Sequence, residues 1–353
     1  MCILLRAYIF ICILFVSICA LQCMDESNNP VDWFVVYKLP TLKHDEKLMK
    51  DGVAYLYMTS MDYSTWKLSN NSINSTDSII GNTLRNLYTN ETNLMYILYN
   101  NEPPNQKTCS NKGHTKGVVV GEHSGGYWLV HSVPHFPELG KKYTFPRSGA
   151  VYGQSFLCIS LDLKNLNTVG VQLQYNEPKI YGENILSNLR SYLPDLANAA
   201  SNVTIKNPPW YSIARLTSKN GVQFTSFAKT ENFEKELYED LVAPSLESDM
   251  VVETWPNGPG RLKSNCTKTF KVFNVKSIFM NIANVSFTTT DDHSKWGVSS
   301  VVSENNWICI GDINRAKHQL LRGGGTVCQK NKQIAKNYQK LVQFVEDCET
   351  NQV

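Results

Sequence analysis

Two stretches of the chain share one pattern. Residues 114–132 read HTKGVVVGEHSGGYWLVHS, and residues 293–314 read HSKWGVSSVVSENNWICIGDIN. Each begins with His-x-Lys, continues into a run typical of a β-strand and passes through a polar turn. Each then reaches a tryptophan fourteen residues after its histidine, at Trp128 and Trp307. A single His-x-Lys often arises by chance, but two copies with a tryptophan at the same offset do so far less often.

The two copies lie about half a chain length apart, which is too far for a solenoid repeat. We interpret them as the sign of a duplicated half-domain. Two similar halves can pack about a pseudo-twofold axis, and such an axis can bring both His-x-Lys pairs into one site.

Each pair has a chemical use. Residues i and i+2 of a strand point to the same face, so His114 projects with Lys116, and His293 with Lys295. Two ammonium groups can neutralise the oxygens of a phosphodiester, the role that a metal ion has in many phosphoesterases. One imidazole can attack phosphorus, while the other protonates the leaving oxygen. The pattern therefore favours phosphodiester chemistry.

The rest of the chain alternates many β-type runs with fewer helical stretches, one of them amphipathic over residues 331–345. This order predicts a mixed α/β fold with a large sheet. We expect an N-terminal half over 21–180, a connector over 181–205 and a C-terminal half over 206–353. The net charge of +3 is too small to predict a nucleic-acid partner by itself.

The N-terminus carries the signs of secretion. Residues 1–20 hold one charged residue, Arg6, a short apolar run and small residues near the end, as in a signal peptide. The alternative is a signal anchor, but the run is shorter than the roughly 20 apolar residues of a membrane span. We expect a soluble mature protein that keeps no membrane anchor after signal cleavage.

Glycosylation sequons and cysteines agree with that route. Three of the ten cysteines fall in the predicted signal peptide, and the remaining seven leave one without a partner in the same chain. No C-x-x-C spacing occurs, so a zinc cage is not expected. Six asparagines fit N-x-Ser/Thr: Asn70, Asn74, Asn90, Asn202, Asn265 and Asn284.

The paired motifs resemble the phospholipase D superfamily, in which each of two halves supplies a His-Lys pair. That family has an aspartate five residues after the lysine, where this chain has Gly121 and Ser300. The departure points to a divergent branch, and the chain resembles the deoxyribonuclease II family. The stretches that carry this resemblance include VDWFVVYKLP, GHTKGVV, GGYWLVHSVPHFP, YGQSFLCIS, DDHSKWGV, WICIGDINR and RGGGTVC.

The resemblance implies a phospholipase D-like pseudo-dimer of two half-domains, each with a β-sheet and flanking helices. It also implies endonucleolytic cleavage of DNA without a divalent metal or other cofactor, leaving 3′-phosphate and 5′-hydroxyl ends. By position, the catalytic residues are then His114, Lys116, His293 and Lys295. We favour His114 as the nucleophile and His293 as the general acid, which an acidic compartment would protonate.

Further residues follow from the same resemblance. Asn314 matches the asparagine of the superfamily's G-S-x-N element, and His131 occupies the corresponding offset in the first motif. We expect both to contact substrate, together with Arg315. The implied disulfides are Cys23–Cys158, Cys266–Cys348 and Cys309–Cys328, which leave Cys109 unpaired.

The sequence leaves other interpretations open. The same scaffold could hydrolyse RNA or lipid phosphodiesters, or the chain could be a secreted, catalytically weak DNA-binding or host-interaction protein. Export and delivery to lysosomes are equally compatible with a signal peptide, and the oligomeric state is open. For the other histidines we expect ordinary surface positions: His44, His123, His135 and His318.

Overall fold

The computed structural model describes residues 21–140, 142–302 and 304–348. An eight-stranded sheet, which we call the N-terminal sheet, has the order β10-β6-β7-β8-β9-β3-β4-β5. Its strands are β3 (Trp33–Lys38), β4 (Tyr55–Thr59), β5 (Asp62–Leu68), β6 (Met95–Asn100), β7 (Lys116–Glu122), β8 (Gly125–His131), β9 (Gln154–Leu161) and β10 (Ile180–Asn184). A separate two-stranded sheet pairs β1 (Cys23–Met24) with β2 (Pro30–Val31).

A second, nine-stranded sheet, the C-terminal sheet, has the order β11-β12-β18-β17-β16-β13-β14-β15, and β19 also pairs with β14. Its strands are β11 (Tyr211–Thr217), β12 (Gln223–Lys229), β13 (Met250–Glu253), β14 (Val272–Met280), β15 (Val285–Thr288), β16 (Trp296–Ser299), β17 (Trp307–Gly311), β18 (Gly324–Lys330) and β19 (Val342–Val345). In both sheets the strand after the His-x-Lys pairs antiparallel with the strand that carries the tryptophan, β7 with β8 and β16 with β17.

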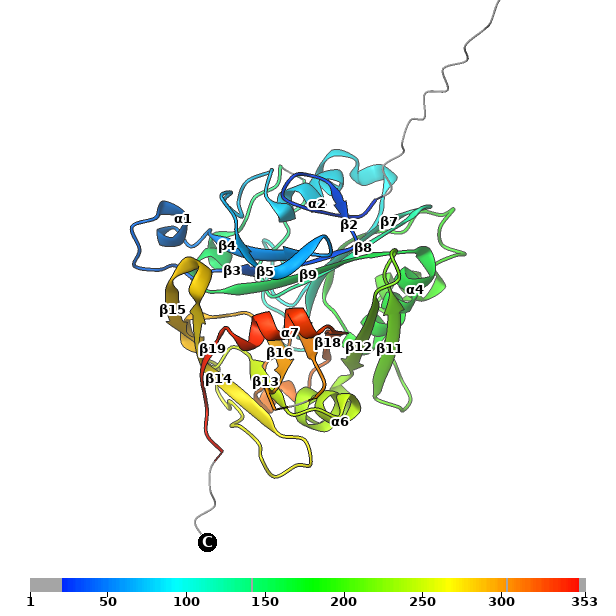
Figure 1. Ribbon diagram of the computed structural model, residues 1–353. Helices are drawn as coiled ribbons and strands as arrows, with labels where there is room; N and C mark the ends of the chain where they lie inside the picture. Colours follow the sequence, from blue (N-terminus) through cyan, green and yellow to red (C-terminus); the bar gives the residue numbers. More distant parts are fainter. Residues whose placement is uncertain (1–20, 141, 303, 349–353) are drawn as a thin grey trace, which may run out of the picture.

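Helices fill the space between the sheets and cover their outer faces (Figure 1). Helix α4 (Leu163–Asn176) contacts β7, β8 and β9 as well as β11 and β12, and α7 (Lys332–Gln339) contacts β5, β16 and β17. Helix α2 (Ile79–Thr89) packs on the outer face of the N-terminal sheet. The other α-helices are α1 (Lys47–Lys50), α3 (Arg147–Val151), α5 (Pro194–Ala200) and α6 (Ala243–Leu246). The chain is therefore mixed α/β, as predicted.

The alternation along β3 shows why these strands are apolar on both faces. Trp33, Val35 and Tyr37 point into the core between the sheets, whereas Phe34 and Val36 point into the outer core beneath α2. Successive side chains of a strand face opposite ways, so a strand covered on both sides reads as a continuous apolar run. The buried faces of both sheets meet in a single central cluster, which holds them together.

The predicted connector over 181–205 contains regular structure. Strand β10 forms the edge of the N-terminal sheet by pairing with β6, and α5 packs against α4. The segment thus completes the N-terminal sheet and its covering layer before the chain enters β11. The division into two halves stays a prediction, because sheet membership alone does not test it.

The C-terminal helix ends earlier than the periodicity predicted. Helix α7 stops at Gln339, and Val342–Val345 form β19 against β14. Leu341 is buried as expected, but Val345 is 38% exposed. The reason is tertiary: β14 offers an unpaired edge, and a stretch with two valines and a phenylalanine suits a strand better than a helix.

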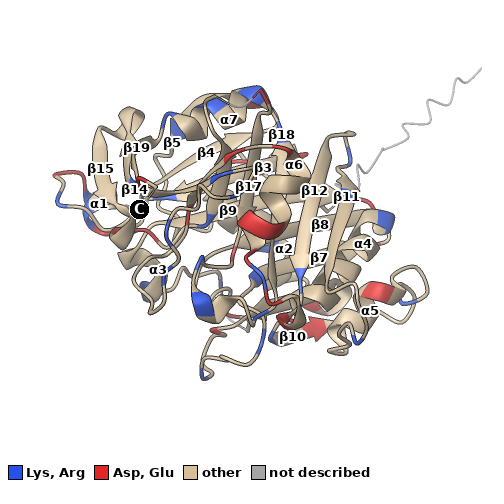
Figure 2. Ribbon diagram, turned by 90° about the horizontal axis from the view of Figure 1, so that it is seen from below, with Lys and Arg blue, Asp and Glu red and all other residues tan. Residues whose placement is uncertain are grey.

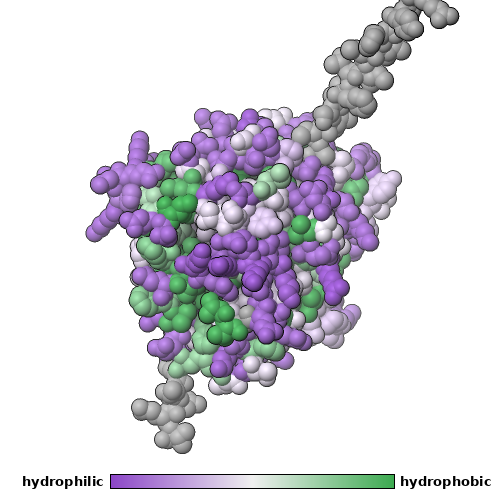
Figure 3. Space-filling view, in the orientation of Figure 1, coloured by the Kyte–Doolittle hydropathy of each residue, from purple (hydrophilic) through white to green (hydrophobic). Residues whose placement is uncertain are grey.

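The three expected disulfides are present, Cys23–Cys158, Cys266–Cys348 and Cys309–Cys328, and Cys109 is a free thiol. The predicted signal peptide, residues 1–20, lies outside the described residues. Among the described helices, none has the length and apolar character required to cross a bilayer. Lysine and arginine are spread over many elements (Figure 2), and hydrophilic residues cover most of the face in Figure 3.

Tyr338 of α7 packs between the two sheets, so its substitution tests the packing there. Its ring lies 5.0 Å from that of Trp66 and 5.3 Å from that of Trp296, and its buried hydroxyl has no hydrogen-bond partner within the described chain. Tyr338→Phe should therefore leave the free energy of unfolding unchanged or raise it by up to about 1 kcal/mol. Tyr338→Ala should lower it by about 3–5 kcal/mol through the cavity it creates. Denaturant unfolding of both variants checks this, and an equal loss in the two would contradict the packing described.

Candidate active site

The first motif enters β7 beside the segment between β17 and β18. The backbone N–H of His114 donates to the carbonyl of Gly323 at 2.9 Å. Its ring Nδ1 lies 2.5 Å from the carbonyl oxygen of Asp312. A carbonyl can only accept, so Nδ1 carries the hydrogen and Nε2 of the neutral ring keeps a free lone pair. The contact therefore fixes both the orientation and the tautomer of His114.

The second motif repeats this arrangement with the partners exchanged. The backbone N–H of His293 donates to the carbonyl of Gly153 at 2.9 Å. Its Nδ1 lies 3.0 Å from the carbonyl oxygen of Ser132 and 3.3 Å from Oε1 of Gln154. His293, which precedes a strand of the C-terminal sheet, is thus oriented by residues of the N-terminal sheet region. His114 is oriented in the opposite sense, so each histidine depends on the other sheet's side of the molecule.

Both histidines line one cavity of about 460 Å³, where they are 6% and 8% exposed. The structure therefore brings together the two motifs that lie half a chain length apart. With Nδ1 of each ring held by a carbonyl, Nε2 is the nitrogen of each imidazole left for chemistry. One cavity thus offers two equivalent imidazole nitrogens, as a double displacement at phosphorus requires.

The two lysines lie behind the histidines and are fully buried. Lys116 Nζ donates to the Oδ1 atom of Asn101 and lies 3.5 Å from Oε1 of Glu102. Lys295 Nζ donates to the carbonyl of His293 at 2.6 Å. Burial lowers the pKa of both ammonium groups, and for Lys295 the nearby charge of Lys116 lowers it further. Neither lysine is among the residues that line the cavity, but Lys116 contacts Asn101 and Glu102, which do line it.

The same charges act on the histidines. Burial lowers the pKa of His114 well below its usual value, and the charges of Lys116 and Arg322 add to the effect. Burial and Lys295 lower the pKa of His293 in the same way, whereas its bond to the Ser132 carbonyl favours the protonated ring. Both rings are therefore held towards the neutral form by their surroundings in the protein. An anion that enters would reverse this bias, because an opposite charge stabilises an imidazolium.

Buried carboxylates support the motifs from behind. The Asp312 side chain accepts from the Thr115 hydroxyl and, at 3.0 Å, from the backbone N–H of Lys116. Burial raises the pKa of Asp312 to about 6, although these hydrogen bonds oppose the rise. On the other side, Asp292 accepts from the hydroxyls of Tyr37 and Ser294. These contacts fix the extended backbone on which each His-x-Lys pair is carried.

Several residues that line the cavity were missed or undervalued in the sequence. Trp255 lies 5.1 Å from the ring of His293 and 4.5 Å from that of Tyr152, in both cases edge to face. Arg322 lines the cavity next to the first motif, and so do His135 and His318, which we expected at ordinary surface positions. The sequence already offers Arg322, in a basic cluster with Arg315 and Lys317 near the second motif, as a possible DNA contact. The remaining residues come from loops whose convergence no local pattern reveals.

Asn314 lines the cavity, and its half-buried side chain has an Oδ1 atom without a hydrogen-bond partner among the described residues. It is therefore available to a substrate or a water molecule. The expectation for Arg315 must be corrected. This side chain is 1% exposed, does not line the cavity, and pairs with Glu239 and Glu236 while donating to Asn274. Its charge is compensated by these contacts within the C-terminal sheet region, away from the cavity.

His131 also needs correction, because it is fully buried and does not line the cavity. Its ring packs against Phe136 and Phe156, at 5.4 Å and 5.9 Å, in the outer core of the N-terminal sheet. Burial lowers the pKa of His131 to about 3, and Lys116 contributes to the decrease. His131 thus neighbours the lysine without facing the cavity. No group of three or more metal-binding side chains was found in the described residues.

Comparison with known proteins identifies the family. A family model for deoxyribonuclease II matches residues 22–348. Deoxyribonuclease-2-alpha of Rattus norvegicus is 38% identical, with 93% of this chain and 95% of that protein covered. Plancitoxin-1 of Acanthaster planci is 37% identical, with 93% of each covered, and deoxyribonuclease-2 of Caenorhabditis elegans is 36% identical, with 90% and 92% covered.

Among solved structures, yeast tyrosyl-DNA phosphodiesterase aligns with a TM-score of 0.31 and 8% identity, covering 62% of this chain and 67% of that one. The sequence matches show that the protein is a phosphodiester hydrolase. Within that class, the chain belongs to the deoxyribonuclease II family.

Substitution of Arg315 should mainly lower stability, whereas substitution of Arg322 should mainly lower activity. Arg315→Ala leaves buried Glu236 and half-buried Glu239 without their cation, so it should lower the free energy of unfolding by about 3–5 kcal/mol. Arg322→Ala should lower kcat/KM by about tenfold, equivalent to roughly 1.4 kcal/mol, with a smaller loss of stability. Unfolding curves and steady-state kinetics on both variants check this. A stable Arg315→Ala protein with reduced kcat/KM would restore Arg315 as a substrate contact.

Proposed function

We propose that the protein is an acid endodeoxyribonuclease that hydrolyses DNA without a divalent metal, through a covalent phosphohistidine, to 3′-phosphate and 5′-hydroxyl ends. The observation that carries this proposal is the reciprocal pair of histidines in one cavity, each with Nδ1 on a carbonyl and two lysines behind. The names of the relatives supply DNA as the substrate class.

In the first step, Nε2 of His114 attacks phosphorus and forms a P–N bond. The bond from phosphorus to the 5′ oxygen breaks, and His293 gives its Nε2 proton to that oxygen. One DNA fragment leaves with a 5′-hydroxyl, and the other stays attached to His114 through its 3′-phosphoryl group. The lysine charges stabilise the phosphoryl oxygens while negative charge develops on them.

In the second step, His293 is neutral and acts as the base. It removes a proton from a water molecule, whose oxygen attacks phosphorus as the P–N bond breaks. The product leaves with a 3′-phosphate, His114 is free again, and His293 is protonated for the next cycle. Protons balance over the two steps, because His293 donates one and recovers one.

The surroundings of the two rings support this division of roles. Four cationic groups, including Arg322, lower the pKa of His114 in addition to burial, which keeps its Nε2 lone pair free for attack. The carbonyl on Nδ1 is common to both rings, so it holds each imidazole in place without distinguishing their roles. Three disulfides and the predicted signal peptide support entry into the secretory pathway, with export or lysosomal delivery afterwards.

Plasmid cleavage near pH 5 with excess chelator tests the proposed activity. The full mature chain should nick and linearise the plasmid, whereas His114→Ala and His293→Ala should each lose about 10³-fold or more in rate. End-group analysis should find 3′-phosphates and 5′-hydroxyls. An intact plasmid with the unmodified chain, or restored cleavage only on addition of Mg²⁺, would contradict the proposal.

The pH dependence should differ between kcat/KM and kcat. His293 must be protonated, so activity falls as pH rises through its pKa. In the free protein burial and Lys295 hold that pKa below the ordinary value of about 6.5. A bound phosphodiester raises it, so kcat should fall at a higher pH than kcat/KM does. Initial rates between pH 3.5 and 8 with chelator check this, and coincident limbs would argue against His293 as the acid.

A further inference from the structure

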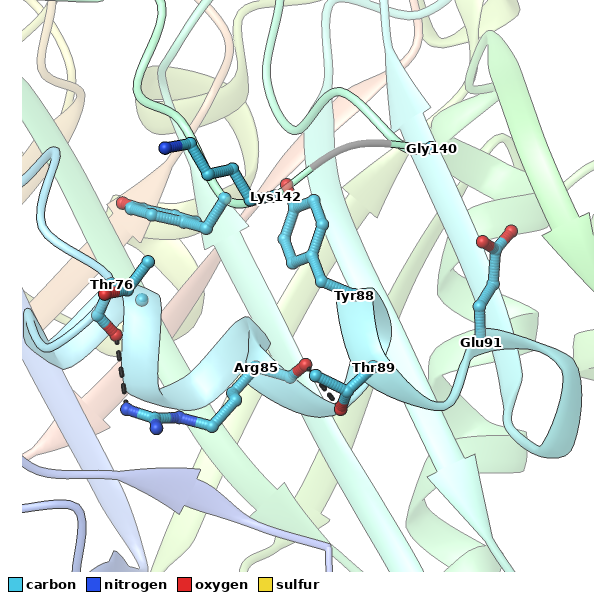
Figure 4. A pocket seen from close by; sticks show the side chains of 9 residues that line it. Thr76, Arg85, Tyr88, Thr89, Glu91, Gly140 and Lys142 are labelled. Carbon is cyan, nitrogen blue, oxygen red and sulfur yellow. Dashed lines mark hydrogen bonds between the residues drawn. The ribbon is translucent and has the colours of Figure 1, made fainter.

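A second large cavity lies away from the catalytic residues. It has a volume of about 590 Å³ and is formed by α2 and the segment that follows Gly140, over the outer face of the N-terminal sheet (Figure 4). Nothing in the proposed reaction uses this cavity, which we call the α2 pocket. It is lined by Thr76, Gly81, Arg85, Tyr88, Thr89, Glu91, Gly140, Lys142 and Tyr143.

Two glycosylation sequons border the α2 pocket. Thr76 of the lining completes the sequon of Asn74, and Glu91 of the lining is the middle residue of the sequon of Asn90. Both asparagines are exposed and lie at opposite ends of the α2 region. A glycan on either would therefore start at the rim of this pocket.

The chemistry of the lining suits an uncharged polar ligand. Arg85 is already compensated, because it donates to Asp77, to Asn82 and to the Thr76 carbonyl, the last drawn as a dashed line in Figure 4. Glu91 accepts from the Tyr96 hydroxyl at 2.7 Å. Arg85 and Glu91 therefore already have polar partners within the protein, and Lys142 is the remaining charged residue of the lining. A sugar needs neither charge.

The lining also has two aromatic rings, against which a sugar can pack. Tyr88 and Tyr143 lie 6.1 Å apart, edge to face. The Tyr143 hydroxyl donates to the Ile73 carbonyl, but the enclosed Tyr88 hydroxyl has no hydrogen-bond partner in the described chain. A buried polar group without a partner is costly, and a ligand hydroxyl or amide would remove that cost.

We propose that Asn74 is N-glycosylated and that its first N-acetylglucosamine packs in the α2 pocket against Tyr88. Asn74 is favoured because its Oδ1 accepts the backbone N–H of Phe145 at 2.7 Å. This bond holds the amide against the segment that supplies Lys142 and Tyr143, and leaves Nδ2 to carry the sugar. The Asn90 amide is held instead by Asn93. In the modification, Nδ2 bonds to the anomeric carbon and loses a proton, and the diphosphate of a lipid-linked oligosaccharide donor leaves.

The consequence is structural. The sugar would join α2 to the segment around Phe145 and bury the Tyr88 hydroxyl in a hydrogen bond. It would therefore stabilise the outer layer of the N-terminal sheet without touching the catalytic cavity. This inference does not depend on the proposed nuclease mechanism, so either can fail while the other stands.

Thermal unfolding of the full chain, secreted from eukaryotic cells, tests the proposal. Thr76→Ala removes the sequon and Thr76→Ser keeps it, so the pair forms a matched control at one position. Thr76→Ala and Asn74→Gln should each lower Tm by about 2 °C or more, whereas Thr76→Ser and the distant Asn202→Gln should not. An endoglycosidase that leaves one N-acetylglucosamine should preserve Tm. Peptide mass analysis without a glycan on Asn74 would overturn the proposal.

Tyr88→Phe supplies the test for contact. In the glycosylated protein it should lower Tm, because the sugar loses a partner. In the Thr76→Ala background it should leave Tm unchanged or raise it, because the hydroxyl there has no partner to lose. Equal effects in the two backgrounds would overturn the packing. A coupling with Asn90→Gln instead would overturn the choice of Asn74.

Discussion

The site depends on an exchange of backbone contacts between the two sheets. Nδ1 of His114 is held by the Asp312 carbonyl, and Nδ1 of His293 by the Ser132 carbonyl, so neither sheet region can orient its own histidine. The backbone N–H groups repeat the exchange through Gly323 and Gly153. A carbonyl acceptor admits a single tautomer, so the docking of the sheets also sets which ring nitrogen is free for chemistry.

This arrangement has an electrostatic consequence. Two buried lysines close to two buried imidazoles would repel protonated rings, and the pKa values of both histidines are lowered accordingly. Glu102 and Asn101 compensate Lys116 in part. The missing negative charge is then the phosphodiester itself, which would restore protonation when it binds. In the proposed mechanism, activity at acid pH follows from the bound substrate, which raises the pKa of the buried histidines. It does not follow from the ordinary pKa of an imidazole in solution.

Much of this could be read from the sequence, and the errors have physical causes. The repeated His-x-Lys and tryptophan predicted a strand after each motif, and the duplication predicted that the two histidines meet in one site. His131 has the expected offset, but its position on β8 directs its ring into the outer core with Phe156. Arg315 lies beside the motif, yet Glu239 takes its charge. Trp255 comes from a loop that meets the site only through tertiary packing, so no spacing could reveal it.

In the proposed mechanism, the two histidines form one site with separate nucleophile and acid roles. The most direct test of these roles runs the reaction at acid pH and quenches it rapidly under alkaline denaturing conditions. Peptide mass mapping then locates any adduct on the protein. The account predicts a 3′-phosphoryl DNA adduct on His114 of the active protein, and none in His114→Ala. Adducts found only on His293 would exchange the roles, and turnover without any histidine adduct would contradict the covalent mechanism.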